Sequence, residues 1–209
     1  MREAHAATVN EDLLESFLND PRPRYRLYEP EQVCVVMGAG RKAEEDVFGL
    51  RAEADGVPVL RRRGGGGTVV LSPGQVVLAL VTEVDSPFQN LAYFRTINHW
   101  FRLALQPLGV SGIEDRGISD LAIEDRKILG TSLYRRRKIL FYQASLMVDN
   151  DLSLFDRYLR FPSRVPDYRL GRGHLEFCTN LRLQGYPLSI LEVSDSLEEV
   201  VRQRLFDLA

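Results

Sequence analysis

The segment with the clearest chemical potential is a run of three arginines, four glycines and a threonine, Arg61–Thr68. Strand-like segments precede and follow this run, so it would connect two strands. Four successive glycines lose much backbone entropy on folding, and an ordinary hairpin needs only one or two of them. Successive bare N–H groups can cradle phosphate oxygens, and guanidinium groups add charge and paired donors. The run therefore predicts an anion-binding loop, with a flexible basic hairpin as the alternative.

A second candidate is Lys127, which follows the polar turn 124–126 and opens an apolar strand. On sequence alone, a lysine at the mouth of a strand is most often a solvated residue. The functional alternative is a compact cation aimed at the charge that develops on a reacting carboxylate and phosphate. The residues around Lys127 leave both interpretations open.

Composition restricts the class of protein. The chain has 209 residues, of which 44% are apolar and 27% charged, and its net charge of −2 argues against a nucleic-acid-binding protein. No apolar run approaches the roughly 18 residues of a membrane span. No signal peptide is visible, and the two cysteines, Cys34 and Cys178, make no disulfide framework, so we expect a cytoplasmic location. A second basic cluster, Arg135–Lys138, is interpreted as a solvated strand end.

Periodicity predicts an α+β fold: one mixed, mainly antiparallel sheet flanked by helices, in a single domain over residues 1–209. Helical spacing or helix-forming composition is found over residues 11–19, 43–54, 90–108, 149–159 and 195–208. The last of these helices is expected to begin at a cap within Ser194–Ser196. Strands are expected over residues 25–28, 32–37, 57–60, 68–84 with a turn at Pro73-Gly74, 119–123, 127–133 and 139–148. Residues 162–172, rich in arginine and proline, are interpreted as a mobile loop.

Two segments in this order resemble the lipoate–protein ligase A family of the biotin/lipoate ligase superfamily. The run Arg61–Thr68 is similar to the family motif Arg-Arg-x-Ser-Gly-Gly-Gly-Ala-Val. Asp120-Leu121, followed by Lys127-Ile-Leu-Gly130-Thr131, is similar to Asn-Asp-Leu, a hairpin, and Arg-Lys-Ile/Val-x-Gly-Ser/Thr. Weaker similarity extends from about Leu27 to Leu183. The resemblance implies the catalytic-domain fold of biotin and lipoate ligases, which is like that of class II aminoacyl-tRNA synthetases.

The resemblance also implies roles for individual residues. Lys127 would be catalytic, holding the acyl carbonyl and the α-phosphate, and Arg62 would contact the phosphate. Asp120 would lie close to the adenylate and help to hold magnesium, although the sequence contains no metal-ligand cluster of its own. The other residues that would bind the acyl-adenylate are Gly64, Gly65, Gly66, Gly67, Thr68, Gly130 and Thr131. Strand valines at positions 36, 70 and 81 would line an acyl tunnel or, alternatively, belong to the ordinary core.

The activity that the resemblance implies has two steps. A lipoate or octanoate carboxylate attacks the α-phosphate of ATP to give acyl-AMP, and a lysine of a lipoyl carrier domain then attacks the acyl carbonyl. ATP, magnesium and lipoic acid are the expected cofactors and substrates. Because the chain ends at Ala209 without the accessory domain of longer ligases, a partner subunit is also expected. No nucleic-acid or membrane partner is expected.

One departure from the family pattern keeps other functions open. The ligases usually have a His-Asp pair after the glycine loop, where this chain has Leu71-Ser-Pro-Gly74. A non-catalytic relative that binds a lipoylated carrier or an acyl-AMP-like ligand therefore remains an alternative. A biotin ligase is disfavoured, because the loop Gly-Arg-Gly-Arg-x-Gly is absent.

A cysteine-dependent octanoyl or lipoyl transferase is the other alternative, since some enzymes of this fold carry the acyl group on a thiol. Cys178 would be its nucleophile, although a small buried hydrophobe is the simpler interpretation, and Cys34 is expected to be inert in its buried strand. His174 could serve as a base but is interpreted as a lone surface histidine. His99 and Trp100 are interpreted as packing residues of the long helix.

Overall fold

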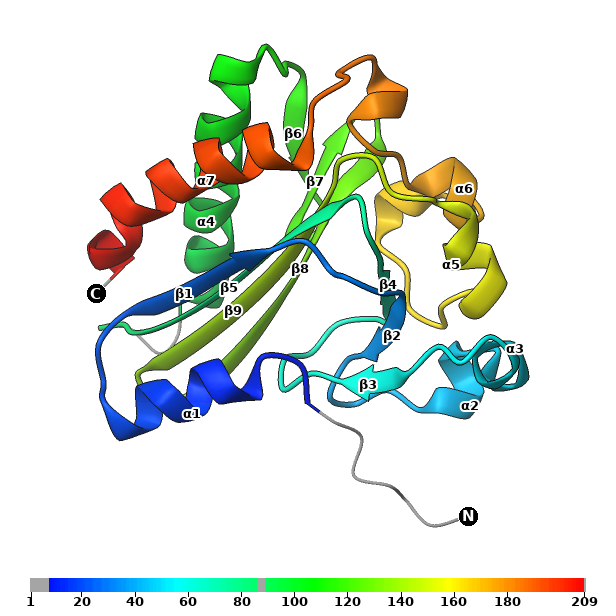
Figure 1. The fold of residues 1–209 in the computed structure, drawn as a ribbon, viewed down its shortest axis with the longest axis horizontal. Helices are drawn as coiled ribbons and strands as arrows, with labels where there is room; N and C mark the ends of the chain where they lie inside the picture. Colours follow the sequence, from blue (N-terminus) through cyan, green and yellow to red (C-terminus); the bar gives the residue numbers. More distant parts are fainter. Residues whose placement is uncertain (1–7, 86–88, 209) are drawn as a thin grey trace.

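The computed structural model describes residues 8–85 and 89–208. Its main feature is a six-stranded antiparallel sheet in the order β1-β5-β9-β8-β7-β6. The strands are β1 (Arg24–Tyr28), β5 (Gln75–Glu83), β6 (Ile113–Arg116), β7 (Asp120–Ile123), β8 (Arg126–Arg136) and β9 (Ile139–Met147). Strands β5, β8 and β9 are the long central members, and they cross the middle of the molecule in Figure 1.

A second, three-stranded sheet lies beside the first and carries the glycine-rich loop. Its order is β3-β2-β4, with β2 parallel to β3 and antiparallel to β4. The strands are β2 (Cys34–Met37), β3 (Val59–Arg61) and β4 (Val69–Leu71). The four glycines connect β3 to β4, and the turn at Pro73-Gly74 then leads from β4 into β5 of the large sheet. The loop is therefore held at the junction of the two sheets (Figure 1).

Two long helices, α4 (Asn90–Leu105) and α7 (Ile190–Arg204), cover one face of the large sheet (Figure 1). Trp100, Phe101 and Leu197 from these helices are buried in the main core. His99 is exposed, so its interpretation as a packing residue was wrong, whereas that of Trp100 is confirmed.

Helix α7 begins at Ile190, earlier than the sequence pattern predicted. Its N-cap is Ser189, whose hydroxyl accepts a hydrogen bond from the Glu192 amide at 3.2 Å. The Glu192 carboxylate in turn accepts one from the Ser189 amide at 2.8 Å. This reciprocal capping box satisfies two otherwise free backbone donors, so the predicted cap within 194–196 was wrong.

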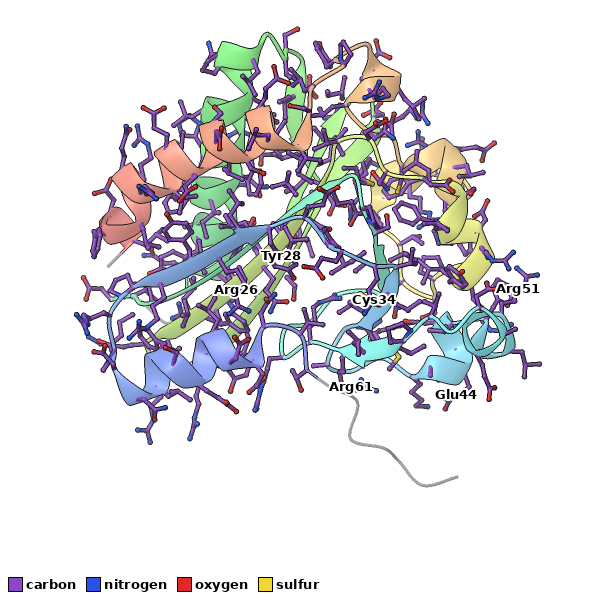
Figure 2. All side chains as sticks on the ribbon, viewed as in Figure 1. Arg26, Tyr28, Cys34, Glu44, Arg51 and Arg61 are labelled. Atoms are coloured by element: carbon purple, nitrogen blue, oxygen red, sulfur yellow. The ribbon has the colours of Figure 1, made fainter. Side chains whose placement is uncertain are left out.

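Helix α1 (Glu11–Asn19) packs on the opposite face of the sheet. Phe17 is its most deeply buried residue, in a cluster that includes Val81 and Phe141. Figure 2 labels two residues of β1 that tie the start of this helix to the sheet: the Tyr28 hydroxyl accepts from Asn10, and Arg26 pairs with Asp12.

Four short helices surround the small sheet: α2 (Ala43–Asp46), α3 (Gly49–Ala54), α5 (Ser153–Tyr158) and α6 (His174–Phe177). Single 3-10 turns occupy Gln106–Leu108, Asp167–Arg169, Arg182–Gln184 and Leu205–Leu208. No helix in the part of the chain that the structure describes is long and apolar enough to cross a membrane.

Part of the segment 162–172 is fixed by packing around Arg169, while its mobility stays a prediction. Arg169 is buried, with its guanidinium 4.8 Å from the ring centres of both Phe161 and Phe177. Its Nε donates to the Arg172 carbonyl at 2.9 Å. Arg169 and Arg172 pack on the ring of Phe177, a contact that composition alone does not reveal. The α+β class, the mainly antiparallel strand pairing and the flanking helices are as predicted. The prediction of one mixed sheet was wrong, because the strands divide into a six-stranded antiparallel sheet and a three-stranded mixed sheet.

Candidate functional site

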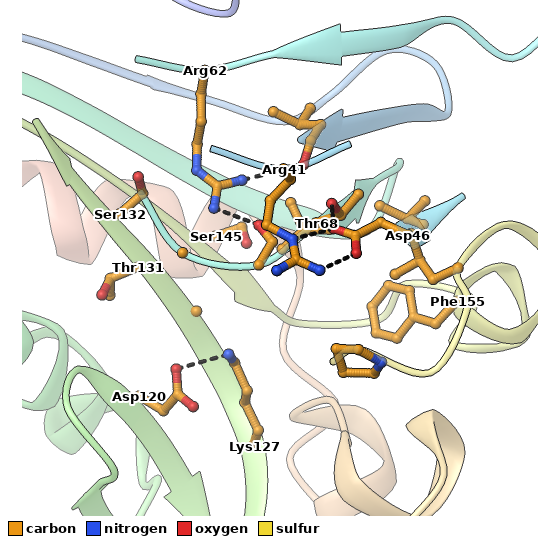
Figure 3. Close-up of a pocket in the computed structure, with 18 of the residues that line it drawn as sticks. Arg41, Asp46, Arg62, Thr68, Asp120, Lys127, Thr131, Ser132, Ser145 and Phe155 are labelled. Carbon is orange, nitrogen blue, oxygen red and sulfur yellow. Dashed lines mark hydrogen bonds and ion pairs between the residues drawn. The ribbon is translucent and has the colours of Figure 1, made fainter. Parts of the chain in front are cut away.

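A cavity of about 830 Å³ opens at the junction of the two sheets. The glycine loop, strands β8 and β9, the segment 160–169 and helix α6 all contribute to its wall. Figure 3 shows Arg62 and Thr68 on one side of this space and Lys127 and Asp120 on the other. The two motifs singled out in the sequence, although far apart along the chain, therefore meet in one cavity.

The four glycines of the loop divide into two kinds. A Cβ on Gly64 would lie 2.0 Å from the Ser132 hydroxyl oxygen, and Gly66 has a φ of +95°. Gly65 and Gly67 have open space where a side chain would be, and both line the cavity. Gly64 thus leaves room for Ser132, and Gly66 adopts a left-handed backbone conformation that favours glycine. Gly65 and Gly67 leave the backbone accessible to a ligand.

Arg62 lies beneath this loop and holds it in shape. Its Nη2 donates to the carbonyls of Gly65 at 2.9 Å and Gly67 at 2.6 Å, and its Nη1 donates to Val36 at 3.2 Å. The side chain is 5% exposed, and no carboxylate in the described residues pairs with it. Burial lowers the pKa of Arg62 to about 10, so the group stays cationic at neutral pH. The phosphate contact that the resemblance implied remains a prediction.

Lys127 is held by Asp120 on the neighbouring strand. The Nζ of Lys127 lies 2.7 Å from Asp120 Oδ1, and a shift of register between β7 and β8 brings Ala122 opposite Lys127. Gly130 leaves room for the lysine, because a Cβ there would lie 3.0 Å from its Cε and 3.1 Å from its Nζ. A larger residue at position 130 would crowd the Lys127 side chain, which explains the glycine in the Lys-x-x-Gly spacing.

The second oxygen of Asp120 accepts a hydrogen bond from the Tyr168 hydroxyl at 2.8 Å. Burial, and then the negative charge of Asp120, raises the pKa of Tyr168, so the phenol is neutral and donates. The Thr131 hydroxyl donates to the Ser119 carbonyl at 3.1 Å, which fixes the chain just before Asp120. Tyr168 was not predicted as a site residue, because it lies in the segment assigned to a mobile loop.

On the other side of the cavity, Thr68 belongs to a small charged network. Its hydroxyl donates to Asp46, and the Nε of Arg41 donates to the same carboxylate at 2.6 Å. Asp46 is 4% exposed, and its bond to Arg41, more than any other cause, lowers its pKa. Arg41 and Asp46 were not predicted as site residues. They become neighbours of Thr68 only through the packing of α2 against the small sheet.

Cys178 lies directly beside the lysine strand. It forms an isolated parallel bridge with Lys127, and the following Thr179 amide donates to the Lys127 carbonyl at 2.9 Å. The side chain lines the cavity but is 8% exposed, and burial raises the pKa of the thiol to about 11. A thiol that stays protonated at neutral pH is a poor nucleophile. Cys34 is likewise buried, as predicted.

His174 is not the surface histidine that the sequence suggested. It is 8% exposed and lines the cavity, and its Nδ1 lies 3.0 Å from Asp156 Oδ1. The packing of α6 against α5 makes this pair, which sequence spacing does not indicate. Burial, more than any other cause, lowers the pKa of His174.

The apolar lining agrees in part with the predicted acyl tunnel. Val36 and Val70 line the cavity, whereas Val81 packs beneath α1 and does not. At the position where the family has a His-Asp pair, Ser72 is buried and its hydroxyl donates to the Pro73 carbonyl at 3.2 Å.

Most of the predicted site residues lie in this one cavity. Those that line it are Arg62, Gly65, Gly66, Gly67, Thr68, Asp120, Lys127, Gly130, Thr131 and Cys178. Gly64 lies behind the wall, against Ser132. No group of three or more His, Cys, Asp or Glu residues that could hold a metal ion occurs within residues 8–85 and 89–208.

The fold and the cavity define a class: an α+β domain in which a glycine loop and a lysine from a neighbouring antiparallel strand face one ligand space. The sequence matches the family model of the lipoyl protein ligase A/B catalytic domain over residues 3–202, and the chain belongs to this family.

The relatives that the chain resembles include both lipoate-protein ligases and octanoyltransferases. The chain is 29% identical over 132 residues to lipoate-protein ligase LplJ of Bacillus subtilis, covering 63% of this chain and 39% of that protein. It is 26% identical over 197 residues to lipoate-protein ligase A subunit 1 of Thermoplasma acidophilum, covering 90% of this chain and 74% of that protein. It is also 26% identical over 179 residues to octanoyltransferase LipM of Carboxydothermus hydrogenoformans, covering 77% of this chain and 66% of that protein.

Solved structures confirm the predicted fold. A lipoate-protein ligase A bound with ATP superposes with a TM-score of 0.78 at 25% identity, covering 94% of this chain and 78% of that one. The bipartite lipoate protein ligase of Thermoplasma acidophilum, described together with its E2 lipoyl domain, gives a TM-score of 0.79 at 24% identity, covering 94% and 76%.

Proposed function

We propose that the chain is an ATP-dependent lipoate or octanoate ligase, which forms an acyl-AMP and transfers the acyl group to a lysine of a lipoyl carrier domain. The observation that carries the proposal is the convergence of the Gly65–Gly67 backbone and Lys127 on one cavity. A related ligase structure contains ATP, and this supports a nucleotide in the same place.

The cavity is electrostatically suited to an acyl-adenylate. Arg62 is a buried cation without a carboxylate partner in the described residues, an arrangement that is costly unless an anion approaches. The free backbone at Gly65 and Gly67 would supply N–H donors to the same phosphate. Lys127 would bind the acyl carbonyl and neutralise charge as AMP leaves, once its bond to Asp120 loosens.

No side-chain nucleophile is required for this reaction. An acyl-AMP is an activated anhydride, so the protein must position it and exclude water. The segment 162–172, anchored by Tyr168 and Arg169, would form one side of that enclosure. Val36, Val70 and Phe155 provide apolar lining for the acyl chain.

Magnesium would bind in this site together with the nucleotide phosphates, and not at a site that the protein forms alone. Both oxygens of Asp120 are engaged, one by Lys127 and one by Tyr168, and the part of the chain that the structure describes holds no cluster of ligands. Magnesium usually binds through one or two carboxylates together with substrate phosphates. Asp120 would be the protein ligand, and the ion would supply charge neutralisation to the phosphates.

We further propose that the chain acts as a single domain with a partner subunit. It covers 74% of a relative named as subunit 1, and a related bipartite ligase is described with an E2 lipoyl domain. The chain spans 39% and 42% of two other lipoate-protein ligases that it matches, from Bacillus subtilis and Staphylococcus aureus.

A cysteine-dependent acyl transferase is the second candidate, favoured by the position of Cys178 beside Lys127 and by the octanoyltransferase relative. The raised pKa of the Cys178 thiol argues against it. ATP-independent transfer that is abolished by Cys178→Ser would establish this alternative.

The test is lipoate-dependent exchange of pyrophosphate with ATP, measured with and without a partner subunit. We expect exchange in the wild-type protein, loss in Lys127→Ala, and no change in Lys138→Ala, an exposed lysine in the β8–β9 turn. Normal exchange by Lys127→Ala would contradict the role of that lysine. Absence of exchange in the wild type under both conditions would reject the ligase.

A further inference from the structure

The acceptor lysine poses a chemical problem that Lys127, Asp120 and the glycine loop do not solve. An ε-amine has an ordinary pKa of about 10.4, so at neutral pH it arrives as an ammonium without a lone pair. Lys127 is proposed to bind the acyl carbonyl as a cation, and Asp120 is proposed to hold magnesium, so neither is free to accept that proton. A base that faces the same cavity is needed.

We infer that His174, held by Asp156, is the general base that accepts the proton of the acceptor lysine in the transfer step. This inference rests on the proposed ligase function and assigns a catalytic residue to its second step. It is carried by the geometry of the pair and by its place in the cavity.

The first observation is the orientation of the imidazole. Nδ1 of His174 lies 3.0 Å from Asp156 Oδ1, which places the ring proton on Nδ1 and leaves Nε2 with a free lone pair. Nε2 has no hydrogen-bond partner within the described residues, while the side chain lines the cavity. A histidine so held is arranged as in other acid–base pairs, in which a carboxylate fixes the tautomer of the base.

The second observation is the backbone connection between His174 and the strand that carries Lys127. The Cys178 amide donates to the His174 carbonyl at 2.8 Å, and Cys178 forms a bridge with Lys127. His174 therefore lies one helical turn from the residue that pairs with the lysine strand. The side chains of His174 and Lys127 line the same cavity.

The third observation is the charge balance around the ring. Burial lowers the pKa of His174, Arg169 on the adjoining wall lowers it further, and Asp156 on α5 opposes both. Lys127 on β8 adds a cation to the same cavity. Glu176, the acidic residue of the same short helix, is turned to the Gly173 amide at 3.0 Å. The ring is thus neutral at neutral pH, as a base must be.

The proposed step conserves charge and atoms. Nε2 accepts a proton from the ammonium, and the resulting amine lone pair forms the N–C bond to the acyl carbonyl. The C–O bond to the phosphate breaks, and its electron pair leaves with AMP. The remaining extra proton on nitrogen passes to water, and His174 then releases its own proton to solvent. The products are the amide and AMP.

The experiment supplies chemically synthesised lipoyl-AMP to the folded chain and compares two acceptors. One is the lysine of a lipoyl carrier domain, and the other is hydroxylamine, which is already neutral at pH 7. The variants are His174→Gln, His174→Ala with and without added imidazole, and Asp156→Asn. His99→Gln, an exposed histidine on α4, is the matched control.

We expect His174→Gln to slow transfer to lysine by about 100-fold or more, while transfer to hydroxylamine changes less than about twofold. Asp156→Asn should show a smaller loss with the same selectivity, and imidazole should partly restore His174→Ala. The deficit should shrink as the pH rises towards the lysine pKa of about 10.4. Equal losses with both acceptors, or unchanged transfer to lysine, would overturn the assignment. Failure of the wild type with both acceptors would instead reject the proposed function.

Discussion

Two neighbouring glycines of the loop offer a sharp test, because the same substitution should have opposite effects on them. In Gly64→Ala, the new Cβ would lie 2.0 Å from the Ser132 hydroxyl and 3.2 Å from the Leu133 amide nitrogen. Overpacking of this kind costs about 1–3 kcal/mol. In Gly65→Ala, the Cβ meets nothing within 4 Å and φ is not in the left-handed region, so the fold is unaffected.

For ATP binding we expect the opposite order, with Gly65→Ala the more damaging of the two substitutions. Gly65 lines the cavity and its Cβ position is open, so we expect the methyl group of Gly65→Ala to keep a phosphate from bonding to the Gly65 amide. Bonds to charged groups contribute about 1.5–3 kcal/mol, which corresponds to a roughly 10- to 150-fold rise in the KM for ATP. Thermal unfolding and pyrophosphate exchange measure the two effects separately.

We therefore expect Gly64→Ala to lower Tm by roughly 2–12 °C and Gly65→Ala to leave it unchanged. Adding Ser132→Ala to Gly64→Ala should recover part of the loss, since it removes the nearest atom. Equal Tm values for the two single variants, or normal ATP binding by Gly65→Ala, would refute the division of roles between these glycines.

Three further predictions concern Tyr168, Cys178 and Asp55. Tyr168→Phe should slow pyrophosphate exchange by roughly 10-fold or more, because it removes a bond to the charged Asp120 carboxylate of about 1.5–3 kcal/mol; an unchanged rate would contradict its role in positioning Asp120. Alkylation of Cys178 by iodoacetamide should be slow at pH 7 and rise with pH towards its pKa of about 11; rapid labelling at pH 7 would revive the thiol nucleophile. The bond to Arg157, more than any other cause, lowers the pKa of Asp55 to about 2, so its stabilising effect is complete above about pH 4 and lost as the pH falls through 2. Asp55→Asn should then lower the free energy of unfolding by urea at pH 7 but not near pH 2, and an equal loss at both would refute the ionic origin.

Local patterns were sufficient to predict most of the fold. Nearly continuous apolar runs located β5 and β9, because these central strands are buried on both faces. The apolar stripe around Trp100 located α4, because burial on one face of a helix leaves a periodic signal. The start of α7 was missed although Ser189 and Glu192 form a readable capping box. A competing cap further along the chain, around Asp195, was preferred.

The site was predictable only where the chemistry is concentrated in short segments. The glycine run and the Lys127–Gly130 spacing are local, so they could be found from the sequence. The pair His174–Asp156 forms because α6 packs against α5. The pair Arg41–Asp46 forms because the chain turns at Arg41 into the short helix α2. Neither pair has a sequence pattern that distinguishes it from ordinary surface charges.

The central claim is that the glycine backbone and Lys127 bind one mixed anhydride, and binding of a non-hydrolysable acyl-adenylate analogue tests it most directly. Calorimetric titration should show tight binding to the wild type and to Lys138→Ala. Gly65→Ala and Lys127→Ala should each bind at least 10-fold more weakly, since each removes a bond to a charged group worth about 1.5 kcal/mol or more. Undiminished affinity in both of these variants would contradict the account.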